Sequence, residues 1–259
     1  MKSDGPLFEV KLAETEVERR AAQRLRYRVF IEELGGAGEM VDHPARLERD
    51  RFDDHFDHLI LTDAALDCAA EDRVVGVYRL LRDDQAKAVG QFYSEDEYDL
   101  SPLRASGRRL LELGRSCVDA RYRGGDAMYH LWQGLSGYVA AHGAEVLFGV
   151  ASFHGTDPDA LAQPLSLLHH RHLAPPALRP RAHAAHYQRM DLVPEAELNR
   201  REAMLRVPAL IKAYLRLGGH VGDGAFVDHA FRTTDVCLVM DTAQMNARQR
   251  NIYAGSARR

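Results

Sequence analysis

The stretch LLELGRSCVDARYRGG, residues 110–125, contains the features from which the fold of this chain can first be inferred. Its first nine residues are mostly apolar, as is typical of a buried strand. Glu112 and Arg115 are unusual there, because Val or Ile would fill a core better. Strict alternation puts these side chains on opposite faces, and they share a face only if a bulge intervenes, for which Gly114 is a natural site. The pair is therefore either an ion pair at a strand end or part of a cleft that uses the carboxylate.

The loop after this strand has two arginines and two glycines, and a helix predicted over 127–142 follows it with Asp126 as its N-cap. Glycines allow close approach to the backbone, a helix N-terminus favours an anion, and arginines add charge-assisted hydrogen bonds. Such a loop suits a phosphate, although a Gly-Gly pair before a helix is more often a plain turn. The candidate phosphate-binding residues are Arg121, Arg123, Gly124 and Gly125.

The composition excludes several classes of protein. The chain has 259 residues, 46% of them hydrophobic, and its 34 basic and 38 acidic residues give no global positive field for nucleic acid. The N-terminus MKSDGPLFEVKLAET has no apolar signal segment, and the longest apolar run, VLFGVASF, is too short to cross a bilayer. Three scattered cysteines suit a reducing compartment. We therefore expect a cytoplasmic protein, at most peripheral at the inner face of the membrane.

Strands and helices alternate along the chain. Strands are expected at 7–13, 58–64, 73–82, 110–118, 144–152, 181–190, 224–231 and 235–242, and helices at 15–34, 94–99, 127–142, 160–173 and 195–217, the last interrupted at Pro208. The acidic segment 35–57 is a long loop, and loops of that length are often functional. This order predicts an α/β chain with one continuous core, a single domain over 1–259.

Four short blocks resemble the acyl-homoserine lactone synthases, which have the GNAT acyltransferase fold. The blocks are LRYRVFIEEL (25–34), DRFD (50–53), VVGVYRLL (74–81) and LELGRSCV (111–118). The resemblance implies a GNAT-like mixed sheet with helices on both faces. By position, it assigns substrate binding to Arg26, Phe30, Asp50, Asp53 and Arg79, and catalysis to Glu112 and Arg115. Gly36 departs from the pattern, since a tryptophan usually stands there in those synthases.

Longer blocks resemble the L-ornithine Nα-acyltransferases of ornithine-lipid synthesis over nearly the whole chain. Among them are FYSEDEYDL, ELGRSCVDARYR, LFGVASFHGTDP and PALIKAYLRLGGHVGDGAFVDHAFRTTDVCLVMD. The resemblance implies a core over about 7–190 with a C-terminal extension of helix and strands over about 191–245. It also implies transfer of a 3-hydroxyacyl chain from acyl carrier protein to the α-amine of L-ornithine, which gives lyso-ornithine lipid. The donor is then a 4′-phosphopantetheine thioester, and no cofactor is bound permanently.

Two other functions remain open. The first is an N-acyl amino acid synthase or an acyl-homoserine lactone-type synthase with another amine acceptor, although Gly36 and the long block 199–241 count against the lactone version. The second is a non-catalytic acyl-carrier-binding protein on the same scaffold. The presence of both Glu112 and the Arg/Gly loop counts against that second function.

Histidine-rich and basic segments are the remaining candidates for a site. The histidines at positions 169, 170, 172, 183 and 186 have no convincing ligand spacing and no cysteine nearby, so we expect no metal. Segments 104–109 and 170–183 are basic and could dock an acidic acyl carrier protein or an anionic membrane surface. A solvated loop explains each of them equally well.

Overall fold

The computed structural model describes residues 5–245, which form two compact units that alternate along the sequence. Unit 1 comprises 5–89 and 113–143, and unit 2 comprises 90–112 and 144–245. Strand β5 (Leu110–Val118) contributes its first three residues to unit 2 and the rest to unit 1. The expected C-terminal extension therefore lies wholly in unit 2, and the expected single domain over 1–259 stays a prediction.

Unit 1 is built on neighbouring strands that follow each other along the chain. β1 (Phe8–Leu12) pairs antiparallel with β2 (Asp57–Asp63), β2 pairs antiparallel with β3 (Val74–Arg82), and β5 is next to β3. The strands predicted at 7–13, 58–64, 73–82 and 110–118 are thus confirmed, and the second and third form a hairpin. Eight of the nine β3 residues are buried, because β3 has a strand on each side and a helix on each face.

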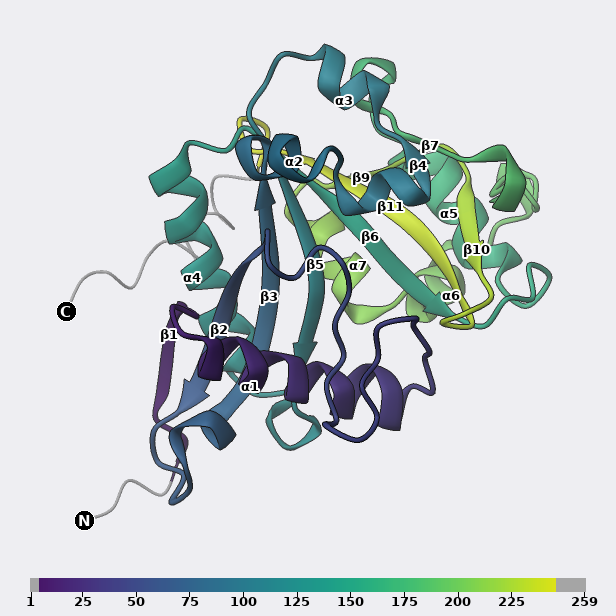
Figure 1. The fold of residues 1–259 in the computed structure, drawn as a ribbon. Helices are drawn as coiled ribbons and strands as arrows, with labels where there is room; N and C mark the ends of the chain where they lie inside the picture. Colours follow the sequence, from purple (N-terminus) through teal and green to yellow (C-terminus); the bar gives the residue numbers. More distant parts are fainter. Residues whose placement is uncertain (1–4, 246–259) are drawn as a thin grey trace. The chain divides into compact units, whose positions relative to one another are not determined.

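Helices cover both faces of the unit 1 sheet (Figure 1). α1 (Glu16–Arg26), purple in Figure 1, contributes Leu25 to a buried cluster that includes Ile60 of β2. α4 (Ala127–His142) lies so close to Leu59 that a Cβ added at Gly134 would meet the Leu59 side chain at 3.4 Å. Because Leu59 and Ile60 are consecutive in one strand, they point to opposite faces. The short helix α2 (Asp83–Val89) follows β3.

The helix that starts at α1 changes character before it ends. Thr15 caps it, and a capping box joins Thr15 and Glu18. After Arg26 the chain continues as a π-helix, Tyr27–Glu33, which the sequence pattern did not predict. Gly35 then ends the helix with φ 71°, a backbone conformation that favours glycine. Long π-helical segments are rare and often occur at functional sites, so this one marks the surroundings of Phe30 for attention.

Unit 2 is built around two long strands, β6 (Val146–His154) and β11 (Thr233–Asp241), which pair antiparallel. β6 also pairs in parallel with Leu110–Glu112 of β5, so it has a strand on each side. Shorter strands complete the unit: β10 (Ala225–Asp228) and β9 (His220–Val221) pair with β11, β8 (Tyr187–Gln188) pairs with β10, and β4 (Tyr98–Asp99) pairs with β7 (Arg181–Ala182).

Four helices belong to unit 2: α3 (Ser101–Ala105), α5 (Ala162–His172), α6 (Arg200–Arg206) and α7 (Ala209–Arg216). α6 and α7 are the helix expected over 195–217, and the break at Pro208 is confirmed because Pro cannot continue the hydrogen-bond ladder. Among the residues that the structure describes, no helix is long and apolar enough to span a bilayer.

Three local predictions were wrong in detail. The strand expected at 181–190 is divided into β7 and β8 by a 3-10 turn, Ala184–His186. The helix expected at 94–99 is a 3-10 turn, Tyr93–Asp96, followed by β4. Asp126 does not cap α4 with its side chain, because its backbone is already helical, with φ −81° and ψ −5°.

Candidate active site

Five residues that the sequence assigned to substrate binding or catalysis lie together in unit 1. They come from four parts of the chain: Arg26 ends α1, Asp50 and Asp53 belong to the loop before β2, Arg79 lies in β3 and Arg115 in β5. Ion pairs connect all five. We call these residues, together with Glu48, the charge cluster.

Asp53 is at the centre of the charge cluster. Its carboxylate accepts hydrogen bonds from Arg26 at 2.7 and 3.2 Å and from Arg79 at 2.6 Å. Arg79 also donates to Asp50 at 2.8 Å, and Asp50 pairs with Arg115 at 3.4 Å. Two buried arginines therefore share one carboxylate, and the chain of contacts extends from Arg26 to Arg115.

Glu48 completes the cluster, and the sequence analysis missed it. Glu48 pairs with Arg26 through one carboxylate oxygen and with Arg115 at 3.1 Å through the other. Three arginines thus face three carboxylates, so their formal charges balance. The available sequence signal was weak, because Glu48 precedes Asp50 by two residues in a loop that also holds other acids, such as Asp54.

Burial makes these ion pairs necessary. The side chains of Arg26, Glu48 and Asp53 are at most 6% exposed, and an unpaired charge at such a site would be costly. Burial alone would raise the pKa of Glu48, but Arg26 and Arg115 outweigh it and hold that pKa below its ordinary range. Burial would also raise the pKa of Asp53, but the charges of Arg26 and Arg79 outweigh it and hold that pKa well below its usual value. Both carboxyl groups are therefore ionised at neutral pH.

His58 lies against the same cluster and is the second residue that the sequence analysis missed. Its side chain is 1% exposed, and its Nε2 lies 3.0 Å from the Asp53 carbonyl oxygen, to which it donates. Burial, with Arg26 nearby, lowers the pKa of His58 to about 4. His58 is therefore neutral at physiological pH, and it adds no charge to the balanced cluster.

Asp50 and Arg115 form the most accessible edge of the charge cluster. Their side chains are 20% and 14% exposed, against 6% or less for the other four members. The Phe30 ring, on the π-helix, has its centroid 6.0 Å from the Arg115 guanidinium carbon. A carboxylate and a guanidinium presented side by side can meet the ammonium and the carboxylate of a small zwitterion.

The expected irregularity of β5 falls on Arg115 and not on Gly114. Arg115 has φ 48°, in the left-handed region, whereas Gly114 is not among the residues with positive φ. A non-glycine residue pays about 1–2 kcal/mol for this conformation. The ion pairs with Glu48 and Asp50 hold the Arg115 side chain in place and offset that cost.

Glu112 belongs to unit 2, where it anchors the 3-10 turn that begins at Tyr93. Its carboxylate accepts hydrogen bonds from the backbone N–H of Tyr93 at 2.7 Å, from the backbone N–H of Ser94 at 2.6 Å and from the Ser94 hydroxyl. The residue is 1% exposed. Glu112 is thus held in one orientation, which is a requirement for a positioned acid or base.

The arginines of the predicted phosphate-binding loop are tied to acids. Arg121 forms hydrogen bonds with Asp119 at 3.0 and 3.1 Å, and Arg123 pairs with Glu33 and donates to the Val118 carbonyl. Gly124 has φ 79°, so a turn requires glycine there, and α4 begins three residues later. A phosphate at this loop would have to replace carboxylates as the partner of the arginines.

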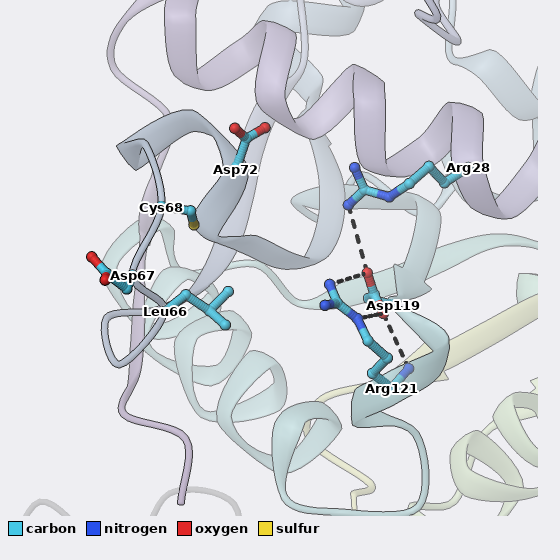
Figure 2. A pocket seen from close by; sticks show the side chains of 7 residues that line it. All are labelled: Arg28, Leu66, Asp67, Cys68, Asp72, Asp119 and Arg121. Carbon is cyan, nitrogen blue, oxygen red and sulfur yellow. Dashed lines mark hydrogen bonds and ion pairs between the residues drawn. The ribbon is translucent and has the colours of Figure 1, made fainter. Parts of the chain in front are cut away.

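A pocket of about 460 Å³ lies beside this loop in unit 1. Figure 2 shows Arg28 and Arg121 both directed at Asp119, with the remaining lining residues opposite them. The lining residues are Arg28, Leu66, Asp67, Cys68, Asp72, Asp119 and Arg121. Arg121 alone among these was a predicted site residue, and none of the seven belongs to the charge cluster.

Cys117 is not placed to act as a nucleophile. It is buried on β5, and burial raises its pKa to about 12. A thiol with that pKa is almost wholly protonated at neutral pH and therefore weakly nucleophilic. The arrangement favours direct attack on an acyl donor over an enzyme-bound acyl intermediate on this residue.

A family model described as an acetyltransferase (GNAT) domain matches residues 25–133, a span that contains all six charged members of the charge cluster and the Arg/Gly loop. The fold and the site thus define an acyltransferase of the GNAT class. An L-ornithine N(alpha)-acyltransferase from Rhodobacter capsulatus is 61% identical over 95% of this chain and 94% of its own, and one from Brucella abortus is 44% identical over 97% and 90%. The chain belongs to the L-ornithine N(alpha)-acyltransferase family.

Solved structures agree on the fold. An N-acyl amino acid synthase from uncultured soil microbes matches with a TM-score of 0.52 at 13% identity, over 93% of each chain. An acyl-homoserine lactone synthase matches with a TM-score of 0.51 at 14% identity, over 97% of this chain and 96% of its own. The expected GNAT-like fold is therefore confirmed.

Proposed function

We propose that this chain transfers a 3-hydroxyacyl group from acyl carrier protein to the α-amine of L-ornithine, and so forms lyso-ornithine lipid in the first step of ornithine-lipid synthesis. The name of its relatives supplies the acceptor. The structural observation that carries the proposal is the pairing of Asp50 with Arg115 at the accessible edge of the charge cluster. We place the reaction in the cytoplasm, at the inner face of the membrane.

Ornithine matches the charges at this edge. At neutral pH it carries one carboxylate and two ammonium groups. Arg115 would bind the carboxylate, and Asp50 would bind one ammonium, so the ligand replaces each ion-pair partner with a group of the same sign. Asp50 and Arg115 would be held in position by the buried members of the charge cluster. The charges of those members are already paired with one another.

The donor thioester would bind through its 4′-phosphopantetheine arm. The phosphate would meet Arg121, Arg123 and the backbone at Gly124 and Gly125, near the start of α4. Coenzyme A carries the same arm, so the loop chemistry alone does not separate a carrier-protein donor from a coenzyme A donor. No permanently bound cofactor is needed for the transfer.

The reaction then balances as a direct acyl transfer. The neutral α-amine attacks the thioester carbonyl carbon, a C–N bond forms and the C–S bond breaks. Glu112 takes one proton from the α-ammonium, directly or through a water, to give this neutral amine, and the proton that the nitrogen loses on C–N bond formation goes to the departing sulfur, which leaves as a thiol. Backbone N–H groups near Gly114 would bind the oxyanion of the tetrahedral intermediate.

A reaction with defined acceptors tests the proposal. The full chain is incubated with 3-hydroxyacyl-acyl carrier protein or with 3-hydroxyacyl-coenzyme A, and thiol release and product mass are measured. We expect product with L-ornithine, acylated on the α-nitrogen, and none with putrescine, which lacks a carboxylate. Preferred acylation of homoserine or of another amine, or no thiol release with any amine, would overturn the proposal.

Glu112→Gln tests the assigned base. We expect kcat to fall by about 100-fold or more, within the range by which general bases accelerate reactions. Thermal unfolding of the variant must be followed beside the rate, because Glu112 also holds the turn at Tyr93 and Ser94. A folded variant that acylates ornithine at the parent rate would remove Glu112 from the mechanism.

Asp50→Asn tests the acceptor site. We expect the KM for ornithine to rise about 10- to 100-fold, because a hydrogen bond to a charged group is worth about 1.5–3 kcal/mol. The KM for the acyl donor should stay unchanged. Asp54→Asn, an exposed acid of the same loop, is the matched control and should behave as the parent. Equal changes in both KM values would contradict the assignment.

A further inference from the structure

Leu205 on α6 is the most exposed large apolar side chain in the described part of the chain. It is 71% exposed, against 56% for Leu7 and less for the others. Single exposed leucines are common on protein surfaces and need no explanation by themselves. What distinguishes Leu205 is the set of side chains around it.

The position of Leu205 follows from the face that α6 and α7 bury. Ala203, Val207, Ile211 and Tyr214 recur at intervals of three or four residues and are at most 6% exposed in unit 2. Ala203 lies on α6, Val207 follows the last residue of α6, and Ile211 and Tyr214 lie on one face of α7. Leu205 lies two residues from Ala203 and Val207, and therefore on the outer face, directed away from the unit 2 core.

Basic side chains accompany Leu205 on this outer face. Arg201 precedes it by one helical turn, Arg206 follows it, and the Lys212 Nζ donates to the Leu205 carbonyl at 3.2 Å. Arg206 donates to the Ala160 carbonyl, and no carboxylate within residues 5–245 forms an ion pair with it. Among the described residues Arg201 has no ion-pair partner. We call Arg201, Leu205, Arg206 and Lys212 the Leu205 patch.

The surrounding segment is positively charged although the whole chain is negative. Residues 199–217 contain five basic residues and one acidic residue, and one of the five, Arg200, pairs with Glu195 just before the segment, whereas the formal charge of the chain is −4. The one acid, Glu202, accepts a hydrogen bond from the Asn199 side-chain amide through its carboxylate and donates its backbone N–H to Asn199 Oδ1 at the helix cap. Positive charge is therefore concentrated at this segment and does not reflect the overall composition.

In the other two basic segments, 104–109 and 170–183, most arginines form ion pairs within the protein. Arg104, Arg108 and Arg109 in 104–109 pair with acids, and so do Arg171 and Arg181 in 170–183. Those segments were the docking candidates of the sequence analysis. Their guanidinium groups are largely neutralised within the protein, whereas the charges of the Leu205 patch face outward.

We propose that the Leu205 patch docks this protein on a membrane surface that contains anionic lipids. An exposed leucine inserts into the boundary between headgroups and acyl chains, while arginine and lysine stems reach past it to the phosphates. Binding of this kind is electrostatic in part and should therefore weaken with salt. The inference rests on the proposed function in one respect: an amphiphilic product would be released into the membrane that the patch contacts.

Vesicle binding tests the contact without catalysis. The full chain is sedimented with vesicles of phosphatidylglycerol and phosphatidylcholine, or of phosphatidylcholine alone, at low and high salt. We expect binding to the anionic vesicles only, weaker at high salt. Leu205→Ser should weaken it about tenfold, as loss of one inserted leucine side chain predicts. The double variant Arg201→Glu, Lys212→Glu should abolish it.

Matched controls lie outside the patch. Leu7→Ser removes another exposed leucine, and Arg20→Glu reverses another exposed arginine; both should bind vesicles as the parent does. Thermal unfolding confirms that each variant is folded. The proposal is overturned if the parent binds neither kind of vesicle, binds both equally, or is weakened no more by patch variants than by controls.

An acyl-transfer assay without vesicles distinguishes docking of a membrane from docking of acyl carrier protein. It also tests the proposed acyl transfer separately from the membrane contact. The patch variants should acylate ornithine at the parent rate. Slower transfer from acyl carrier protein with unchanged vesicle binding would identify the patch as a carrier-protein dock and overturn the membrane proposal. Absence of acyl transfer by every variant and by the parent, with patch-dependent vesicle binding, would refute the proposed function and leave the membrane contact standing.

Discussion

Glu48 illustrates how much one buried residue can organise. It lies between Arg26 and Arg115, whose guanidinium groups come from the first helix and from β5. Without this carboxylate, two arginines would face only Asp50 and Asp53, and Arg79 already uses both of those acids. The cluster therefore depends on an equal number of positive and negative groups, and loss of one buried partner costs far more than loss of an exposed ion pair.

At the residue scale, His58 makes stability depend on pH. In the unfolded chain His58 takes up a proton near pH 6.5, but in the folded chain only near pH 4. Between these values the unfolded state binds more protons than the folded state. The contribution of His58 to the free energy of unfolding is therefore fully present above about pH 6.5 and is lost as the pH falls toward 4. The slope should approach about 1.4 kcal/mol per pH unit.

Urea unfolding at several pH values between 7 and 5 measures this slope. His58→Gln should flatten the dependence, whatever its effect on stability at pH 7. A His58→Gln protein with an unchanged slope would contradict the assignment of His58 as a buried neutral histidine.

At the scale of elements, the contact between α4 and the unit 1 sheet depends on a missing side chain. A Cβ at Gly134 would overlap a methyl carbon of Val10 on β1 and lie 3.4 Å from Leu59 on β2. The helix therefore approaches two strands more closely than alanine allows. Gly76 on β3 plays the same part, since a Cβ there would meet Leu131 at 2.8 Å.

Two glycines of α4 provide an internally controlled prediction. Gly134→Ala should destabilise the protein by about 1–3 kcal/mol through overpacking. Gly137→Ala has open space around its new Cβ and should instead stabilise the helix by about 0.5–1 kcal/mol. Denaturant midpoints of the two variants and the parent decide this, and equal effects at both positions would contradict the packing described for α4.

At the scale of the whole molecule, the three cysteines differ in accessibility. Cys117 and Cys237 are buried, and burial raises the pKa of both. Cys68 is partly exposed in the pocket beside Arg121. Direct acyl transfer needs none of these thiols.

Alkylation of the native protein tests this description. Iodoacetamide should add one group per chain, at Cys68, and Cys68→Ser should take up none, as measured by intact mass. Acyl transfer should continue at the parent rate in Cys117→Ala. Rapid labelling of Cys117, or loss of transfer in a folded Cys117→Ala variant, would contradict direct attack of the amine on the donor.

The sequence determined the order of elements and most of their bounds, because hydrophobic period, caps and breakers act within a few residues. The start of the first helix at position 15, the strands β2 and β3, the extent of α4 up to Gly143 and the break at Pro208 were all predicted in this way. Sequence resemblance also selected residues of the charge cluster, although it did not say how they meet.

Tertiary structure alone decided the pairing of charges and the character of the surface. Glu48 and Arg115 are 67 residues apart, and no local pattern brings their side chains within 3.1 Å. The positive φ of Arg115 and the neutral state of His58 likewise arise from partners that only folding supplies. In the sequence Leu205 is one apolar residue among many. Its exposure follows from the packing of α6 and α7, which buries other residues of this segment. Contacts between distant segments depend on how elements pack, and local sequence periodicity does not contain that information.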